Sequence, residues 1–218
     1  MRGQGLSVYN SRMQSMVLHI LFWQWIPTPI FICLRGADAA VLAGVTEVYE
    51  KGNTRWARFQ VLEAIKGQMA HGDTFSIQFA SRNTEGIWTS VFYPEAIYFK
   101  EPGGGETSLL LLSATQEGYT LYPYYPYAAL SPPADDPGFV YRIRALAEFD
   151  TLGPDTSLIR DCLESESRIF QESGLYLARY LRDTSLARDI RAFLESPDGN
   201  LRSIAKETLA KWGLKWGN

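Results

Sequence analysis

Two β-rich runs around a short polar triplet constrain this chain more than any other feature. Residues 37–50 and 54–66 are rich in Val, Thr, Phe and Trp, and the triplet at 51–53 separates them. Within the second run, apolar and polar side chains alternate from Ala57 to Val61. Such alternation buries one face of a strand and leaves the other face in water. The pattern predicts an antiparallel β-hairpin, and we expect the rest of the N-terminal half to extend the same sheet.

Further strand signals follow the hairpin. Residues 74–80 alternate strictly, and residues 87–93 and 95–100 are shorter candidates. The continuous apolar run at 109–112 predicts a strand that is buried on both faces. Two prolines in the segment 118–127 restrict it to the edge of a sheet or to an extended connection.

A change of period divides the chain near residue 131. The segment 131–137 contains three prolines and two aspartates, which is typical of a linker. Beyond it, apolar side chains recur with a period of about 3.6 residues, which predicts helices. These signals predict an α+β chain: a β domain at 37–130, a linker at 131–137 and a small helical domain at 138–218.

The helical half contains an internal similarity. The motif Leu-Glu-Ser at 163–165 returns at 194–196, and Leu-Ala-x-Tyr at 177–180 returns as Leu-Ala-x-Trp at 209–212. Offsets of 31 and 32 residues agree with the length of helix-pair repeats in solenoid proteins. Accidental similarity of two short motifs is the alternative interpretation.

Three strand motifs within residues 37–114 carry a family resemblance: ADAAVLAGVTEV, RFQVLEAIKG and GDTFSIQF. Their order resembles the tissue-inhibitor-of-metalloproteinase/netrin-like β-barrel of exported bacterial proteins. The resemblance implies an antiparallel OB-like barrel. In the inhibitors, a cysteine at the mature N-terminus chelates the protease metal. Cys33 is the only cysteine near Ala37, so we do not carry the inhibitor chemistry over to this chain.

The span 158–213 is similar to HEAT-like helical repeats, most clearly in FLESPDGNLRSIAKETLAKWG at residues 193–213. The resemblance implies that Asp198 and Arg202 stabilise the turn between paired helices. The chemistry of these residues agrees, because an aspartate caps a helix N-terminus and an arginine bonds to nearby carbonyl groups. The resemblance therefore implies a packing and interaction surface and not a catalytic centre.

The N-terminal segment 1–36 has the pattern of a leader. Residues 16–34 are apolar and contain no Asp, Glu, Lys or Arg, and they follow a polar segment whose charges are Arg2 and Arg12. A basic lead before an apolar stretch predicts a signal peptide or a membrane anchor. Ala-Asp-Ala at 37–39 fits a cleavage site.

The leader hypothesis has consequences and one alternative. We expect an extracytoplasmic protein (periplasmic, secreted or membrane-anchored) that associates with a membrane through residues 16–34 and folds without residues 1–36. Pro27 and Pro29 interrupt a spanning helix, so a buried N-terminal segment is the alternative interpretation.

Composition argues against several functional classes. The net charge of −3 provides no basic field for nucleic acid. Two histidines and two cysteines support neither a His-rich metal site nor a disulfide framework. Cys162 lies on an apolar helical stripe, which favours a buried thiol over a nucleophile. We predict no cofactor, no metal site and no catalytic residue, and the balance favours a protein that is not an enzyme.

Two acidic pairs, Asp135/Asp136 and Glu164/Glu166, are the remaining candidates for catalysis. Paired carboxylates suit glycosidase chemistry or a cation site. The first pair lies in the linker and the second near a helix end, so solvated charge is the favoured interpretation.

A tyrosine-rich stretch supplies the candidate binding residues, Tyr122, Tyr124, Tyr125 and Tyr127. Tyrosine combines an apolar ring with a polar tip, which suits recognition surfaces. The alternative is a structural strap that joins the two halves of the chain. We predict an exported or envelope-associated, non-catalytic binding or scaffold protein whose partner is another protein. The alternatives are a carboxylate-based hydrolase and a protease-inhibitor-like module.

Overall fold

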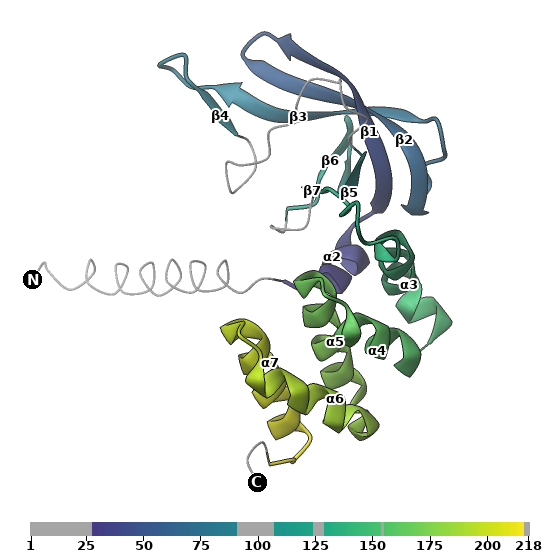
Figure 1. Cartoon of the computed structure of the whole chain (residues 1–218). Coiled ribbons are helices and arrows are strands. Elements are labelled where there is room, and N and C mark those ends of the chain that lie inside the picture. Colours follow the sequence, from purple (N-terminus) through teal and green to yellow (C-terminus); the bar gives the residue numbers. More distant parts are fainter. Residues whose placement is uncertain (1–27, 91–106, 124–128, 154, 216–218) are drawn as a thin grey trace, which may run out of the picture.

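The chain folds into an antiparallel sheet followed by a group of helices, as Figure 1 shows. The computed structural model describes residues 28–90, 107–123, 129–153 and 155–215. The α+β class predicted from the sequence is confirmed, because the strands lie in the N-terminal part and the helices follow them. Among the described residues, the short helix α2 (Ile30–Gly36) precedes the strands.

The strands are β1 (Ala39–Lys51), β2 (Thr54–Lys66), β3 (Thr74–Arg82), β4 (Trp88–Ser90), β5 (Thr107–Thr115), β6 (Gly118–Leu121) and β7 (Ala129–Leu130). The later helices are α3 (Phe139–Leu152), α4 (Thr156–Glu164), α5 (Arg168–Leu181), α6 (Ala187–Ala192) and α7 (Gly199–Lys211), with 3₁₀ turns η1 (Thr184–Leu186) and η2 (Phe193–Glu195). The hydrogen-bonded order of the sheet is β4-β3-β2-β1-β5-β6, and β7 pairs with β5.

The predicted hairpin forms the centre of the sheet. β1 and β2 pair antiparallel and turn at Gly52, whose φ of +60° suits glycine because it has no Cβ. Ala57, Phe59 and Val61 lie in the apolar cluster of the sheet and are fully buried. The alternation in the sequence is thereby confirmed, and so is the strand predicted at 74–80, which is β3. The candidate strand at 95–100 lies outside the described residues.

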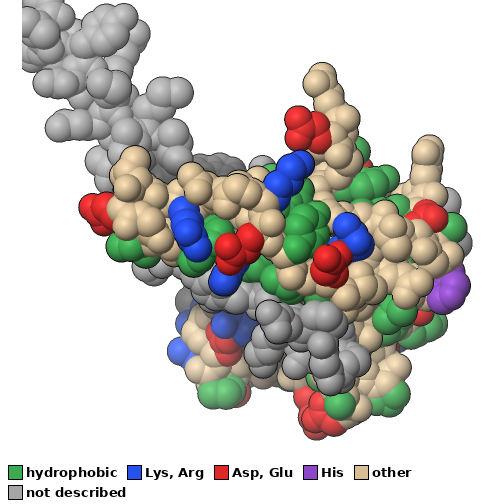
Figure 2. All heavy atoms as spheres, turned by 90° about the horizontal axis from the view of Figure 1, so that it is seen from above, with side chains coloured by type: hydrophobic (Ala, Val, Ile, Leu, Met, Phe, Trp, Pro, Cys, Tyr) green, Lys and Arg blue, Asp and Glu red, His purple; other side chains and the backbone are tan. Residues whose placement is uncertain are grey.

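The polar face of the sheet carries cross-strand ion pairs. Arg58 Nη1 lies 2.7 Å from Glu47 Oε2. The ring of Trp88 contacts the guanidinium groups of Arg55 and Arg82, which lie 4.8 and 4.6 Å from its centroid. Figure 2 looks down on the sheet and shows basic and acidic side chains next to one another. Because opposite charges pair locally, this face is a solvated surface without a strong field of one sign.

The sheet is curved but not closed. β1 shifts register against β2 at several points between Ala40 and Glu47, and such bulges bend a strand. β3 and β6 approach each other, and the rings of Phe75 and Tyr119 meet edge to face with 6.2 Å between their centroids. β4 and β6 remain the two ends of the hydrogen-bonded path. The observed architecture is therefore an open, curved antiparallel sheet.

Strand β5 separates two apolar clusters. Leu109 and Leu111 pack with the helices, whereas Leu110 and Leu112 pack inside the curved sheet. All four side chains are 0% exposed. The prediction of a strand buried on both faces is confirmed. β5 contributes side chains both to the apolar cluster of the helices and to that of the sheet.

Helix α2 belongs to the apolar cluster of the helices (Figure 1). Ile30, Cys33 and Leu34 are 0% exposed. In the structure, α2 thus packs as part of the fold, and the predicted domain boundary at Ala37 stays a prediction. A hydropathy pattern is the same whether lipid or protein covers an apolar segment, and here protein covers it. Membrane association through residues 16–34 stays a prediction.

Lys66 at the end of β2 fixes the C-terminal end of α2. Its Nζ donates hydrogen bonds to the carbonyl oxygens of Leu34, Arg35 and Ala37 at 2.7, 2.9 and 2.6 Å. Cations near a helix C-terminus are stabilised by the partial negative charge of its free carbonyl groups. The sheet begins directly after α2, because the backbone N–H of Asp38 donates to the carbonyl oxygen of Leu112 in β5 at 2.8 Å.

The proposed leader itself lies largely outside the described residues, which begin at residue 28. A signal peptide or anchor within 1–27 therefore stays a prediction. Within the described part of the chain, no helix has the length and apolar character needed to cross a membrane.

The helical half contains two similar units, α4–α5 and η1–α6–η2–α7, and each begins with the same cap. Asp155 Oδ1 accepts from the backbone N–H of Ser157 at 2.8 Å, and Asp183 Oδ1 accepts from that of Ser185 at 3.0 Å. Hydrogen bonds from the serine hydroxyl and backbone N–H lower the pKa of each aspartate. The start signal at 155–157 is confirmed.

The turn between paired helices is also repeated. Gln171 Nε2 donates to the carbonyl of Ser165 at 2.7 Å in the first unit. In the second unit, Arg202 Nη1 donates to the carbonyl of Ser196. Asp198 caps α7 by accepting from two backbone N–H groups of its first turn. The positions expected for Asp198 and Arg202 at this turn are confirmed, and the interpretation of the two units as a repeat stays a prediction.

Candidate functional site

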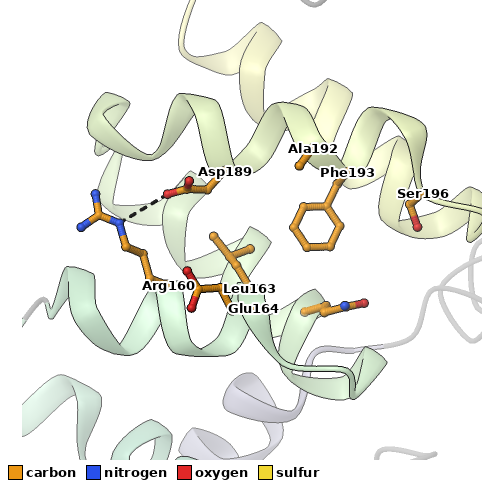
Figure 3. A pocket seen from close by; sticks show the side chains of 8 residues that line it. Arg160, Leu163, Glu164, Asp189, Ala192, Phe193 and Ser196 are labelled. Atoms are coloured by element: carbon orange, nitrogen blue, oxygen red, sulfur yellow. Dashed lines mark hydrogen bonds and ion pairs between the residues drawn. The ribbon is translucent and has the colours of Figure 1, made fainter.

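A cleft with a volume of about 310 Å³ lies between α4 and the segment α6–η2 (Figure 3). Its walls come from the first helices of the two repeated units. The residues that line it are Arg160, Leu163, Glu164, Gln171, Asp189, Ala192, Phe193 and Ser196. Ligand pockets in proteins span roughly 300–1,000 Å³, so this cleft fits a few side chains of a partner or a small molecule.

Helical spacing places the lining side chains. The apolar stripe predicted for α4 is buried, which turns Arg160 and Glu164, one helical turn apart, towards the cleft. On the opposite wall, Ala192 and Phe193 follow Asp189 by three and four residues, which places both on the same face as Asp189. Both walls therefore follow from the 3.6-residue period of the helices.

One end of the cleft is polar. Arg160 Nε lies 3.4 Å from Asp189 Oδ2, and this pair bridges the two walls (Figure 3). Its side chains are 49% and 38% exposed, so the pair contributes only about 0–1 kcal/mol. Glu164 is exposed, and among the described residues it has neither a hydrogen-bond nor an ion-pair partner. The polar end thus carries one uncompensated carboxylate.

The other end of the cleft is apolar. Figure 3 shows the ring of Phe193 directed into the space between the two walls, with Leu163 on the facing helix. Leu163 is buried and Phe193 is half-buried, while Ala192 is exposed at the rim. Ser196 and Gln171 complete this end, and both take part in the repeated turns. The cleft therefore combines an apolar anchor point with a negatively charged rim.

Of the four predicted tyrosines, the structure describes Tyr122, which does not line this cleft. Tyr122 is half-buried at the junction of the sheet and α2, and its ring and hydroxyl pack against Gly36. Its backbone N–H donates to the carbonyl of Leu111 at 2.8 Å. Tyr124, Tyr125 and Tyr127 lie outside the described residues, so a binding role for the tyrosine stretch stays a prediction. The position of Tyr122 agrees with the strap interpretation.

The two thiols are buried in the cluster of the helices. Burial raises the pKa of Cys33 to about 12. Burial, with a smaller contribution from the nearby Asp161 carboxylate, raises the pKa of Cys162 to about 12 as well. Thiolates are the nucleophilic form, so both cysteines are inert near neutral pH. This agrees with the buried thiol predicted at Cys162.

The acidic residues predicted as catalytic candidates do not form one site in the structure. Glu164 lines the cleft, whereas Glu166 is exposed and does not. Asp136 is structural, since its Oδ1 accepts from the N–H of Gly138 at 3.1 Å and forms an ion pair with Arg142. No group of three or more His, Cys, Asp or Glu side chains is arranged to hold a metal ion among the residues that the structure describes.

The inhibitor-like alternative requires a free, exposed end at the first strand. Ala37 is 2% exposed and continuous with α2, and its carbonyl accepts from Lys66. In the structure, the start of β1 is therefore an interior part of the folded chain, and the inhibitor-like alternative stays a prediction.

Arg160, Asp189 and Phe193 were not among the residues predicted for binding. One signal could have identified the first two: Asp-Thr-Ser-Leu-x-Arg-Asp occurs at 155–161 and again at 183–189. Aligning these copies places Arg160 and Asp189 on equivalent helices of neighbouring units. The offset of 28 residues differs from the offsets of 31 and 32 later in the repeat, and this difference hides the alignment.

Known proteins provide no further guide to this site. No family model matches the chain, and a search of the curated proteins finds no match either.

Proposed function

We propose that this chain is a non-catalytic binding protein that holds another protein through its helical half. The observation that carries the proposal is the cleft between equivalent helices of two stacked units, with its apolar anchor point and charged rim. Stacked helical repeats form extended surfaces that serve recognition. The cleft volume suits one or two side chains of a partner segment better than a whole domain.

The chemistry of the cleft favours a partner segment with an apolar side chain next to a basic one. Phe193 and Leu163 offer contact area to the apolar side chain. Glu164 offers a carboxylate that has no partner among the described residues. The exposed Arg160–Asp189 pair costs little to rearrange, so it can open to admit the segment.

We propose two finer assignments of fold to accompany this function. The curved sheet is a half-open OB-like barrel of the tissue-inhibitor-of-metalloproteinase/netrin-like kind, and the contact of Phe75 with Tyr119 across β3 and β6 supports it. The helical half is a pair of HEAT-like repeats, which the equivalent caps at Asp155 and Asp183 support.

We also propose an exported or envelope-associated location. The basic lead and apolar stretch within residues 1–27 support it. Because α2 is part of the apolar core, we place the end of the leader before Thr28 and not at the Ala-Asp-Ala sequence at 37–39.

The test is to fill the cleft. Ala192 is exposed at its rim, so A192W blocks the cleft without disturbing the core. A210W is the matched control, because Ala210 is exposed on α7 and does not line the cleft. Immobilised wild-type protein and A210W should capture the same proteins from an extract of the source cells, and A192W should lose them. Identical capture by all three proteins would refute the proposal.

One observation favours a second candidate, the carboxylate-based hydrolase: Glu164 and Asp189 line the same cleft. Panels of nitrophenyl glycosides and esters test this candidate. Turnover that disappears in both E164Q and D189N, with unchanged thermal unfolding, would replace the binding proposal with the hydrolase.

A further inference from the structure

Three polar contacts between the two helical units have the same polarity. Each of three pairs joins a donor of the first unit to a carboxylate of the second: Thr156–Asp183 at 3.0 Å, Arg160–Asp189 at 3.4 Å and Arg179–Glu207 at 2.8 Å. The same polarity is found one step earlier, where Arg142 of α3 lies 3.7 Å from Asp161 of α4. Arg168 and Asp198, 3.1 Å apart, have the same polarity, whereas Asn200 of the second unit donates to Glu172 of the first at 2.8 Å. The shared polarity therefore belongs to these pairs and not to every contact between the units.

The sequence repeat identifies the forward donors of the second unit. Asp-Thr-Ser-Leu-x-Arg-Asp occupies 155–161 and returns at 183–189. Thr184 and Arg188 are therefore the equivalents of Thr156 and Arg160. In the later helices, Leu-Ala-Arg returns as Leu-Ala-Lys. Lys211, in the last turn of α7, is accordingly the equivalent of Arg179.

These three residues, Thr184, Arg188 and Lys211, form what we call the donor face. All three are exposed. No carboxylate or other polar group within the described part of the chain bonds to their side chains, whereas each equivalent in the first unit has one. Figure 1 places α6 and α7 on the side of the helical group away from the sheet, where a partner can approach.

We propose that the donor face docks a helical surface of a partner protein that presents three carboxylates in the arrangement of Asp183, Asp189 and Glu207. Charge complementarity supports this occupant, since the equivalent donors of the first unit all pair with such carboxylates. A phosphate backbone is the poorer fit, because one of the three groups is an uncharged hydroxyl and the chain carries a net charge of −3. None of the three residues lines the cleft, so this surface goes beyond the proposed function.

Two disulfide-closed helical hairpins serve as probes in the experiment. One carries Asp, Asp and Glu at positions that copy residues 183, 189 and 207, and the other carries Asn, Asn and Gln. Fluorescence anisotropy with the full chain at low salt should show the carboxylate hairpin binding at least about tenfold more tightly than the amide hairpin. The double variant R188Q/K211Q should abolish this preference, since both residues are exposed and leave the fold intact.

K51Q is the matched control, because Lys51 is exposed at the turn of the sheet hairpin, far from α6 along the chain. It should bind both hairpins like the wild-type protein. Equal binding of the two hairpins by the wild type would overturn the proposal, and so would an equal loss in K51Q. Tighter binding of a duplex DNA of equal charge would also overturn it and indicate a polyanion surface. A192W should leave hairpin binding unchanged, which separates this inference from the cleft.

Discussion

Replacing Lys66 with methionine removes the ammonium group that joins α2 to the sheet and keeps most of the apolar stem. The Nζ of Lys66 donates to three carbonyl oxygens at the end of α2, at distances of 2.6–2.9 Å. The substitution leaves these carbonyls without their charged donor, while the apolar side chains of Ile30 and Leu34 stay in place. It therefore tests the join itself and not the packing of α2.

The expected loss of stability follows from the contacts. A hydrogen bond to a charged group contributes roughly 1.5–3 kcal/mol, and an unsatisfied buried acceptor costs roughly 1–3 kcal/mol. The three bonds share one ammonium group, and water can reach some of the freed carbonyls, so the terms do not add fully. We expect K66M to lower the free energy of unfolding by about 2–4 kcal/mol. For a chain of this size, that corresponds to a fall in Tm of roughly 4–16 °C.

Urea and thermal unfolding followed by circular dichroism measure this loss. K51M is the control, because Lys51 is exposed and its side chain has no partner among the described residues. A surface substitution of this kind should change stability by less than about 0.5 kcal/mol. K66R keeps the charge but not the compact geometry, so its free energy of unfolding should lie between those of K66M and K51M. If K66M unfolds like K51M, then α2 is not held by Lys66, and its assignment to the folded part loses its main support.

Three further predictions follow from the described residues. A fragment of residues 28–218 should unfold cooperatively. A fragment of residues 37–218 should be less stable by several kcal/mol, at about 2–5 kcal/mol for each large buried side chain removed. Equal unfolding temperatures of the two fragments would support the leader boundary at residue 37. The buried thiols of Cys33 and Cys162 should react with Ellman's reagent at pH 8 only after unfolding, and rapid reaction of the native protein would contradict their burial. D155N should flatten the pH dependence of stability in acid: the folded-state pKa of Asp155 is lowered, so its contribution is present above the ordinary pKa of 3.8 and is lost as the pH falls through the folded value. An unchanged acid profile in D155N would mean that the capping carboxylate does not titrate as inferred.

Local periodicity predicted much of the fold. The alternation around Phe59 depends only on the geometry of a strand, and the structure buries the expected face. The run at 109–112 has no alternation, and its side chains lie alternately in the two apolar clusters on either side of β5. The cap at Asp198 likewise depends on neighbouring residues alone. Each of these features depends on residues that are close together in the sequence, which is why a sequence pattern can identify it.

The remaining features depend on contacts between distant segments. Residues 30–34 are apolar in any environment, and only the position of Lys66 at the end of β2 shows that they lie in the core. The cleft depends on the register between two repeated units, which a variable offset hides in the sequence. Whether the sheet closes depends on how far bulges in β1 bend it, and residue types do not determine that angle.

The cleft and the donor face are related by the alignment of the two helical units. The pair Arg160–Asp189 closes the polar end of the cleft, and the same alignment of units leaves Arg188 exposed one step further on. The two surfaces should nevertheless respond differently to salt. Screening over a Debye length of about 8 Å at physiological ionic strength weakens contacts between exposed charges, so a partner on the donor face should dissociate as salt rises. A segment anchored on Phe193 binds through apolar area, and its affinity should change little. A salt titration of two bound partners therefore assigns each to its surface before any substitution is made, and an equal salt dependence for both would show that a single charged surface accounts for all binding.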